Sequence, residues 1–126
     1  MTQALTRLRA RGHIGIRLGL GRMQALLANL DDPQASLRGA LIAGTNGKGS
    51  VAAIAATVLT AAGHSVGTSP SPHLHSNRER VTINGEPIGS AELDTLLDEV
   101  LDASEHGEDE FGPATEFELL TAAAYL

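Results

Sequence analysis

The residues best suited to chemistry lie in one glycine-rich stretch, residues 44–50. Its glycines leave the backbone free to approach a ligand, so successive N–H groups can point at phosphate oxygens. Lys48, the only lysine of the chain, adds a mobile positive charge for the β- and γ-phosphates, and Ser50 adds a hydroxyl beside the phosphates or a metal ion. The stretch predicts a nucleotide-phosphate loop made of Gly44, Thr45, Asn46, Gly47, Lys48, Gly49 and Ser50.

The spacing of this loop departs from the general phosphate-loop pattern. Gly44 precedes Gly47 by three residues where the pattern has five, and Gly49 separates Lys48 from Ser50. A glycine-rich turn between a strand and a helix, with a solvated lysine, is therefore the alternative. We favour the phosphate loop because no structural requirement visible in the sequence calls for so many glycines in so short a stretch.

Three apolar segments must position this loop. Residues 40–43 predict a buried strand, residues 51–62 predict a helix that is apolar almost all round and buried on several faces, and residues 64–68 predict a second strand. A strand, a helix and a strand within so few residues form a βαβ unit with parallel strands. The fold class predicted is α/β, with the phosphate loop at the carboxyl edge of the sheet, where ligands of such folds bind.

The loop that follows the second predicted strand, residues 69–80, leaves the sheet at the same edge. Its prolines disfavour a helix. We expect it to face the phosphate loop and to offer Ser71 as an oxygen ligand for a metal ion and Arg78 or Arg80 as partners of an anion. The two histidines of this loop have no adjoining carboxylate, so we interpret them as solvated or hydrogen-bonded side chains.

The remaining segments predict scaffold elements. Residues 81–88 alternate around Asn84 and Gly85, the strongest short signal for a β-hairpin. Thr115 and Glu118 have the spacing of a capping box at the start of a helix. Further helices are expected over residues 2–10, over residues 22–30 and from Ser90 onward, and residues 102–113 are expected to form an acidic, solvated loop. The apolar and glycine residues 18–21 predict a connecting loop, with a cover for a flat ligand as the alternative.

Composition limits the class of protein. The 126 residues fit one domain, and the lack of cysteine excludes disulfides and thiolate chemistry. No apolar run approaches the roughly 20 residues of a membrane span, so we expect a cytoplasmic protein without a membrane partner. Residues 1–63 carry seven basic and two acidic side chains, whereas residues 64–126 carry two basic and thirteen acidic ones. Because the basic half lacks interleaved aromatic residues, nucleic-acid binding is not expected.

The sequence also predicts an incomplete domain. Two parallel strands are fewer than such a sheet needs, and a phosphate-loop enzyme takes a magnesium-binding carboxylate from a further strand. The last apolar helix has no stop signal before Leu126. We therefore expect residues 1–126 to be part of a longer chain that supplies the rest of the domain.

One enzyme family shares four stretches of this chain in the same order and spacing: residues 43–51, 71–74, 79–85 and 115–118. In these stretches the chain resembles the folylpolyglutamate synthase and dihydrofolate synthase family, a branch of the Mur ligases. Residues 18–20 before Arg22 also resemble the substrate loop near the N-terminus of that family. One departure is Pro70, where many members have threonine, and the repeated Ser-Pro pair leaves Ser69 as an alternative to Ser71.

The resemblance implies an ATP-dependent ligase of folate biosynthesis and one-carbon metabolism. L-glutamate would be joined to dihydropteroate or to a folate through an acyl phosphate, with release of ADP and phosphate. Residues 1–126 would be the N-terminal part of a three-layer ATP-binding domain. They would be inactive alone, because the rest of that domain and a C-terminal glutamate-binding domain would lie outside them. The family's motifs imply that Lys48 is catalytic, that Ser71 and Ser50 bind Mg²⁺, and that the pterin site is lined by Gly19, Leu20, Thr115 and Phe117.

Two other functions stay open at the level of sequence. A peptidoglycan-type Mur ligase shares the phosphate-loop core, although the stretch around Ser71 argues against it and the additional N-terminal domain expected there is lacking. A nonenzymatic module that binds nucleotide phosphates is the third.

Overall fold

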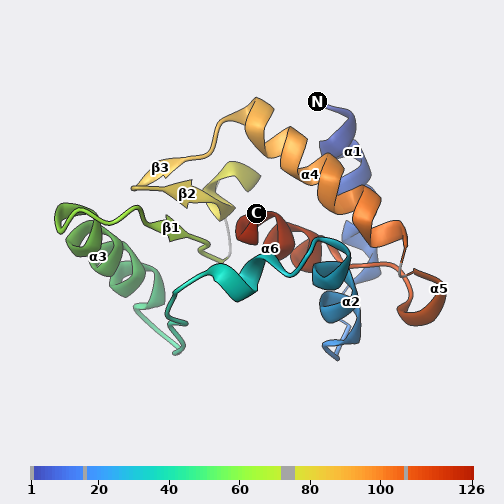
Figure 1. Ribbon diagram of the computed structural model, residues 1–126, viewed down its shortest axis with the longest axis horizontal. Coiled ribbons are helices and arrows are strands. Elements are labelled where there is room, and N and C mark those ends of the chain that lie inside the picture. Colours follow the sequence, from blue (N-terminus) through green and yellow to red (C-terminus); the bar gives the residue numbers. More distant parts are fainter. Residues whose placement is uncertain (1, 16, 72–75, 107) are drawn as a thin grey trace. The chain divides into compact units, whose positions relative to one another are not determined.

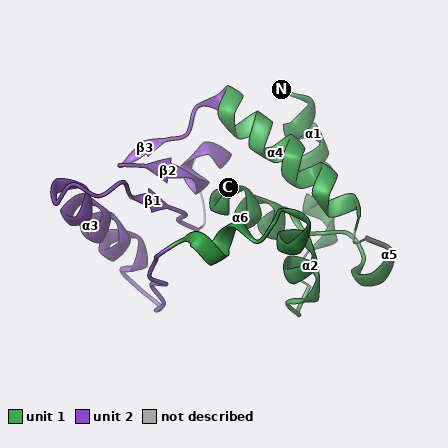
Figure 2. Cartoon of the chain, in the orientation of Figure 1, with its two compact units in different colours: residues 1–37, 91–126 green, residues 38–90 purple. Residues whose placement is uncertain are grey.

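The structure is a computed structural model that describes residues 2–15, 17–71, 76–106 and 108–126. The chain forms two compact units, which Figure 2 distinguishes by colour. The first consists of Met1–Leu37 together with Ala91–Leu126, and the second of Arg38–Ser90. The second unit is therefore inserted in the sequence between the two halves of the first.

The first unit is helical (Figure 1) and contains α1 (Gln3–Ala10), α2 (Gly21–Asn29), α4 (Ser90–Glu105), α5 (Glu108–Phe111) and α6 (Glu116–Tyr125). Both α1 and α2 contact α6, although these helices lie at opposite ends of the sequence. The shared core is aliphatic, and its largest fully buried side chains are Leu8, Leu93, Leu97, Val100, Leu101 and Leu119. Short 3₁₀ turns occupy Gly12–Ile14 and Pro33–Ser36.

The predicted helix from Ser90 is confirmed, but the predicted acidic loop over residues 102–113 is wrong in part. Helix α4 continues to Glu105, and α5 follows within the same range. The buried stripe of α4 explains the extension, because Ser104 continues the helical spacing of Leu97 and Leu101. The Ser104 hydroxyl donates a hydrogen bond of 2.7 Å to the carbonyl of Leu101, so its burial leaves no donor unpaired.

The second unit contains α3 (Lys48–Ala61), β1 (Gly67–Thr68), β2 (Thr82–Ile83), β3 (Glu86–Pro87) and a 3₁₀ turn (Asn77–Arg80). The predicted hairpin is confirmed: β2 and β3 pair antiparallel across Asn84 and Gly85, whose φ angles are 51° and 86°. Two positive φ angles are typical of the tight turn that such pairs favour. Asn84 also accepts a hydrogen bond of 2.9 Å at its Oδ1 from the Val66 amide beside β1.

The predicted parallel pair does not form within the described residues. Residues 40–43 carry no β-ladder, and β1 pairs antiparallel with β2. The expected burial of the following helix is also wrong, since Ala56 is the buried residue of α3 while Ile54 and Val58 are 64% and 62% exposed. A buried parallel strand needs hydrogen-bonded neighbours and covering layers, which the described ranges do not supply.

Among the residues that the structure describes, none of the helices combines the length and the apolar character needed to cross a bilayer.

Candidate functional site

The glycine-rich stretch forms the start of α3. The helix begins at Lys48, and Gly47 precedes it with φ 77° and ψ 0°, a left-handed conformation that glycine adopts without steric cost. Glycine has no side chain with which to cap the helix. The first N–H groups of α3 are thus offered to a ligand, and together with the helix dipole they favour an anion.

The glycines of this stretch are not all required by the fold. Gly44 and Gly47 have φ angles of 151° and 77°, which explains both. Gly49, in contrast, lies within α3 without a positive φ, and, apart from its chain neighbours and the adjacent backbone of its own helix, a Cβ added to it would meet no described atom within 4 Å. Neither packing nor backbone conformation therefore requires a glycine at position 49. Open space beside an amide at a helix start is what a phosphate oxygen requires, which favours the phosphate loop over a plain glycine-rich turn.

The side chains of the loop are accessible. Thr45, Asn46 and Ser50 are exposed, and Lys48 is half-buried. A Cβ placed on Gly44 would lie 3.8 Å from Cγ of Lys48, so the lysine stem lies along the glycine. The stretch therefore combines backbone donors, a cation and a hydroxyl at one helix terminus, the donor set that polyphosphate binding needs.

Ser71, the expected metal ligand, is exposed in the same unit. The residues that follow it, 72–75, include both loop histidines and lie outside the described residues. Within the described ranges, no group of three or more histidine, cysteine or carboxylate side chains is placed to hold a metal ion. Arg78, which the sequence predicts as a possible anion partner, donates from Nε to the carbonyl of Ile88 at 2.6 Å and so ties the 3₁₀ turn to the end of the hairpin.

The four residues that the resemblance assigns to a pterin site all lie in the first unit. Gly19 has a φ of 111°, and Leu20 and Phe117 are 70% and 58% exposed. Thr115 is buried. Exposed apolar side chains thus stand on both segments, on the loop before α2 and on the first turn of α6, and a flat ring can bind against such surfaces.

The predicted capping box at the start of α6 is confirmed. The Glu118 amide donates to Thr115 Oγ1 at 3.2 Å, and the Thr115 amide donates to Glu118 Oε2 at 2.8 Å. The sequence interpretation missed a third partner: Arg22 Nε donates to the same Glu118 oxygen at 3.2 Å. This ion pair is almost fully buried, with side-chain exposures of 11% for Arg22 and 10% for Glu118.

Burial by itself raises the pKa of the Glu118 carboxyl, but the hydrogen bonds from Thr115 and Arg22 outweigh it, and the pKa lies below the ordinary value of a glutamate. Glu118 is therefore ionised at neutral pH. The sequence carried a signal for one partner only, because Arg22 precedes Leu26 of the core-facing stripe by one helical turn. An arginine on a core-facing stripe requires a buried acceptor.

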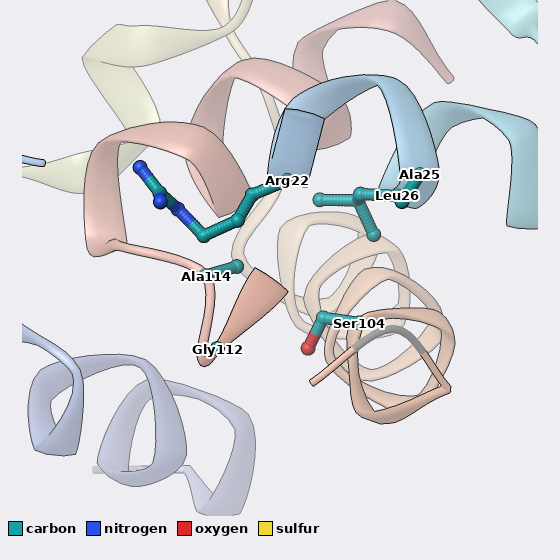
Figure 3. A pocket seen from close by; sticks show the side chains of 6 residues that line it. All are labelled: Arg22, Ala25, Leu26, Ser104, Gly112 and Ala114. Atoms are coloured by element: carbon teal, nitrogen blue, oxygen red, sulfur yellow. The ribbon is translucent and has the colours of Figure 1, made fainter. Parts of the chain in front are cut away.

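A small pocket lies next to this pair and is lined by Arg22, Ala25, Leu26, Ser104, Gly112 and Ala114. Figure 3 shows the guanidinium of Arg22 pointing away from Ser104. The cavity volume is about 10 Å³, room for roughly one water molecule. A pterin cannot enter such a space, so the exposed surfaces of Leu20 and Phe117 are the better candidates for ligand contact.

The chain is similar to known proteins in sequence and in fold. No protein-family model matches the chain. The dihydrofolate synthase/folylpolyglutamate synthase of Bacillus subtilis is 42% identical over 113 residues, which are 89% of this chain and 26% of that protein. The chain thus spans about a quarter of the length of this curated relative.

Two solved structures are similar in fold. The first is a bifunctional folylpolyglutamate synthase/dihydrofolate synthase with manganese, AMPPNP and L-glutamate bound, with a TM-score of 0.83 and 30% identity over 99% of this chain and 30% of that chain. The second, a folylpolyglutamate synthase complex with AMPPCP and folate, has a TM-score of 0.77 and 38% identity over 95% of this chain and 31% of its own.

These similarities bear on the predictions from sequence. They confirm the predicted class, a partial domain of an α/β ligase fold, although the strands described here pair antiparallel. Over most of its length, the chain is therefore similar to a segment of the folylpolyglutamate and dihydrofolate synthases, and it spans about a quarter of their length.

Proposed function

We propose that the protein to which this chain belongs joins L-glutamate to dihydropteroate or to a folate, with ATP as the energy source. The observation that carries the proposal is the start of α3. Gly47 has a left-handed conformation there, neither packing nor backbone conformation requires a glycine at position 49, and Lys48 is half-buried. These features suit a helix terminus that binds a polyphosphate. The names and bound ligands of the similar proteins support the choice of substrates. Residues 1–126 form the N-terminal part of the ATP-binding domain in this proposal.

In this proposal, one group of residues binds the triphosphate and another binds the pterin. The amides of residues 44–50 and Lys48 hold the triphosphate and neutralise the charge that develops while a substrate carboxylate attacks the γ-phosphorus. ADP leaves as the acyl phosphate forms. The acyl phosphate then reacts with the amine of glutamate, which loses a proton, displaces phosphate and forms the amide bond. Gly19, Leu20, Thr115 and Phe117 bind the pterin and so hold the carboxylate end of the substrate in place.

Mg²⁺ is the proposed metal ion, with the hydroxyls of Ser50 and Ser71 as ligands. Oxygen donors suit this cation, and it commonly binds through few protein ligands together with phosphate oxygens. The donor set of the described residues fits such a partial site, since Ser50 stands in the first turn of α3 and both serines are exposed. When bound, the ion would neutralise phosphate charge.

The remainder of a longer chain is part of the proposal. Helix α3 is mostly apolar from Val51 onward, yet Val51, Ile54 and Val58 are more than half exposed. Apolar surface of this extent favours burial. We propose that further segments of the same protein cover it and complete the site, and that the enzyme acts in the cytoplasm, without nucleic acid or membrane as a partner.

The test is the Lys48→Ala variant of the full-length protein. We expect ADP release in the presence of glutamate and a pteroate or folate substrate to fall by about a hundredfold or more, the usual effect of removing one group that stabilises charge in the transition state. Arg38→Ala is the matched control, because it removes a cation from an exposed position in the same unit.

The outcomes separate the three functions. Wild-type turnover in Lys48→Ala would remove the proposed role of the loop. ADP release that depends on a nucleotide-linked sugar in place of a pteroate would indicate a peptidoglycan-type ligase. ATP binding without turnover by the full-length protein under any of these conditions would indicate a nonenzymatic module.

A further inference from the structure

One arginine joins the two segments that carry the proposed pterin residues. Arg22, in the first turn of α2, donates from Nε to Glu118 Oε2 at 3.2 Å and from Nη2 to the carbonyl of Arg17 at 3.0 Å. Arg17 stands at the start of the loop that contains Leu20, and Glu118 directly follows Phe117. The rigid, planar guanidinium thus holds the loop with one nitrogen and the start of α6 with another.

Glu118 in turn fixes the direction in which the Thr115 hydroxyl donates its proton. Its Oε2 accepts the Thr115 amide at 2.8 Å and the Thr115 hydroxyl at 2.9 Å, while the Thr115 hydroxyl oxygen accepts the Glu118 amide at 3.2 Å. A threonine hydroxyl has one donor and two acceptor positions. Its proton is therefore committed to Glu118, and one acceptor position remains. Toward a ligand, Thr115 can only accept, and an amino group or ring N–H matches it.

The loop is also packed near its end at Gly21. A Cβ added there would lie 2.9 Å from Cε1 of Phe111 in α5, so the aromatic ring rests directly on the glycine backbone. The side chains of Arg22 and Glu118 are only 11% and 10% exposed, whereas Leu18, Leu20 and Phe117 have exposures of 92%, 70% and 58%. The contacts of Arg22 and Gly21 thus fix the backbone of both segments, while the apolar side chains of these segments remain exposed to a ligand.

We propose that Arg22 and Glu118 are a positioning pair, which holds the loop of residues 17–20 and the turn of residues 115–117 in the arrangement that binds the pterin and keeps Thr115 a hydrogen-bond acceptor. The proposal rests on the proposed function for the identity of the ligand. A buried ion pair adds little to stability compared with apolar residues of similar volume, so a role in geometry accounts for its presence. Neither residue touches the reacting atoms in this proposal.

The principal variant is Glu118→Gln in the full-length protein, because glutamine keeps the capping box and removes the charge. Arg22→Met removes the other partner. Arg7→Met is the matched control: Arg7 also bridges two helices of the same unit, through Asp98, Asp102 and Glu105 of α4, but touches neither segment.

Two measurements are made on each variant. The first is the rate of trypsin cleavage after Arg17, relative to cleavage after Arg38 in the other unit. The second is steady-state turnover with the pteroate or folate substrate and with ATP varied separately. We expect Glu118→Gln and Arg22→Met to raise the relative cleavage rate and the KM for the pterin substrate about tenfold each, the effect of losing one charge-assisted hydrogen bond. The KM for ATP and kcat should stay unchanged, and Arg7→Met should match the wild type.

Other outcomes overturn the proposal. Unchanged cleavage after Arg17 in both variants would mean that the pair does not hold the loop. Equal rises in the KM for ATP and the KM for the pterin substrate, or the same changes in Arg7→Met, would indicate a general loss of structure. If the wild-type protein shows no turnover with any pteroate or folate, the proposed function fails and the pterin role fails with it. The cleavage rates then still decide whether the pair fixes the loop.

Discussion

Removing the charge of Glu118 is expected to destabilise the protein more than most single substitutions. In Glu118→Gln the Arg22 guanidinium keeps its bond to the Arg17 carbonyl but loses its carboxylate partner while only 11% exposed. Breaking a buried ion pair by removing one partner costs roughly 3–5 kcal/mol. Because the capping box survives and the arginine retains one acceptor, we expect the lower end, a loss of about 3 kcal/mol in the free energy of unfolding.

The double variant Arg22→Met with Glu118→Gln tests this reasoning. It leaves no buried charge, it keeps the cap of α6, and methionine fills much of the volume of the arginine stem. Replacement of a buried ion pair by apolar groups of similar volume is often neutral. We therefore expect the double variant to unfold within about 1 kcal/mol of the wild type, more stable than Glu118→Gln alone.

The pH dependence supplies an independent check. The pKa of Glu118 lies below its ordinary value because the hydrogen bonds from Thr115 and Arg22 outweigh the effect of burial. A depressed pKa means that the stabilisation is complete above the ordinary glutamate range of about 4.3 and is lost as the pH falls through the folded-state value. The difference between the wild type and Glu118→Gln should thus be full at pH 7 and shrink below about pH 4.

Urea denaturation followed by circular dichroism measures all of these differences. The reasoning is refuted if Glu118→Gln is as stable as the wild type at pH 7. It is equally refuted if the double variant is no more stable than Glu118→Gln, because the cost would then come from the cap or from packing and not from an unpaired buried charge.

Two further predictions concern the fold. Leu97→Ala, at a fully buried position of α4, is expected to lower the free energy of unfolding by about 3 kcal/mol through the cavity it leaves, and Leu96→Ala, half-buried on the same helix, should cost clearly less in the same urea titration. Asn84→Ala loses the bond from the Val66 amide and places alanine at a φ of 51°, so a loss of about 2 kcal/mol is expected. Asn84→Gly keeps the backbone conformation and should recover about half of it; equal losses would contradict the role of the left-handed turn.

Local features were predictable from the sequence because their causes lie within a few residues. The hairpin at Asn84 and Gly85 depends on two residues that tolerate positive φ, and the capping box depends on Thr115 and Glu118, one helical turn apart. The helix predicted over residues 51–62 is also present, although α3 begins three residues earlier, at Lys48 directly after Gly47. In each case a short stretch specifies its own hydrogen bonds.

Features that join distant segments were not predictable in the same way. The partners Arg22 and Glu118 are 96 positions apart, and the capping box already gave Glu118 a sufficient explanation. The predicted parallel pairing of residues 40–43 depended on neighbouring strands whose presence no local pattern establishes. The extension of α4 was not predicted because the acidic residues at its end are typical of a solvated loop, and the polar Ser104 does not stand out as a continuation of the buried stripe.

The two proposed sites differ in what holds them in shape. A phosphate is bound largely by backbone N–H groups, so the loop before α3 depends on the φ angles of Gly44 and Gly47 and needs little support from other side chains. A flat ring is bound by side chains, whose directions must be fixed by their neighbours. That difference explains why the exposed Leu20 and Phe117 stand beside a buried ion pair, whereas Gly49 borders open space. Substitutions far from the ligand should therefore alter pterin binding more readily than phosphate binding.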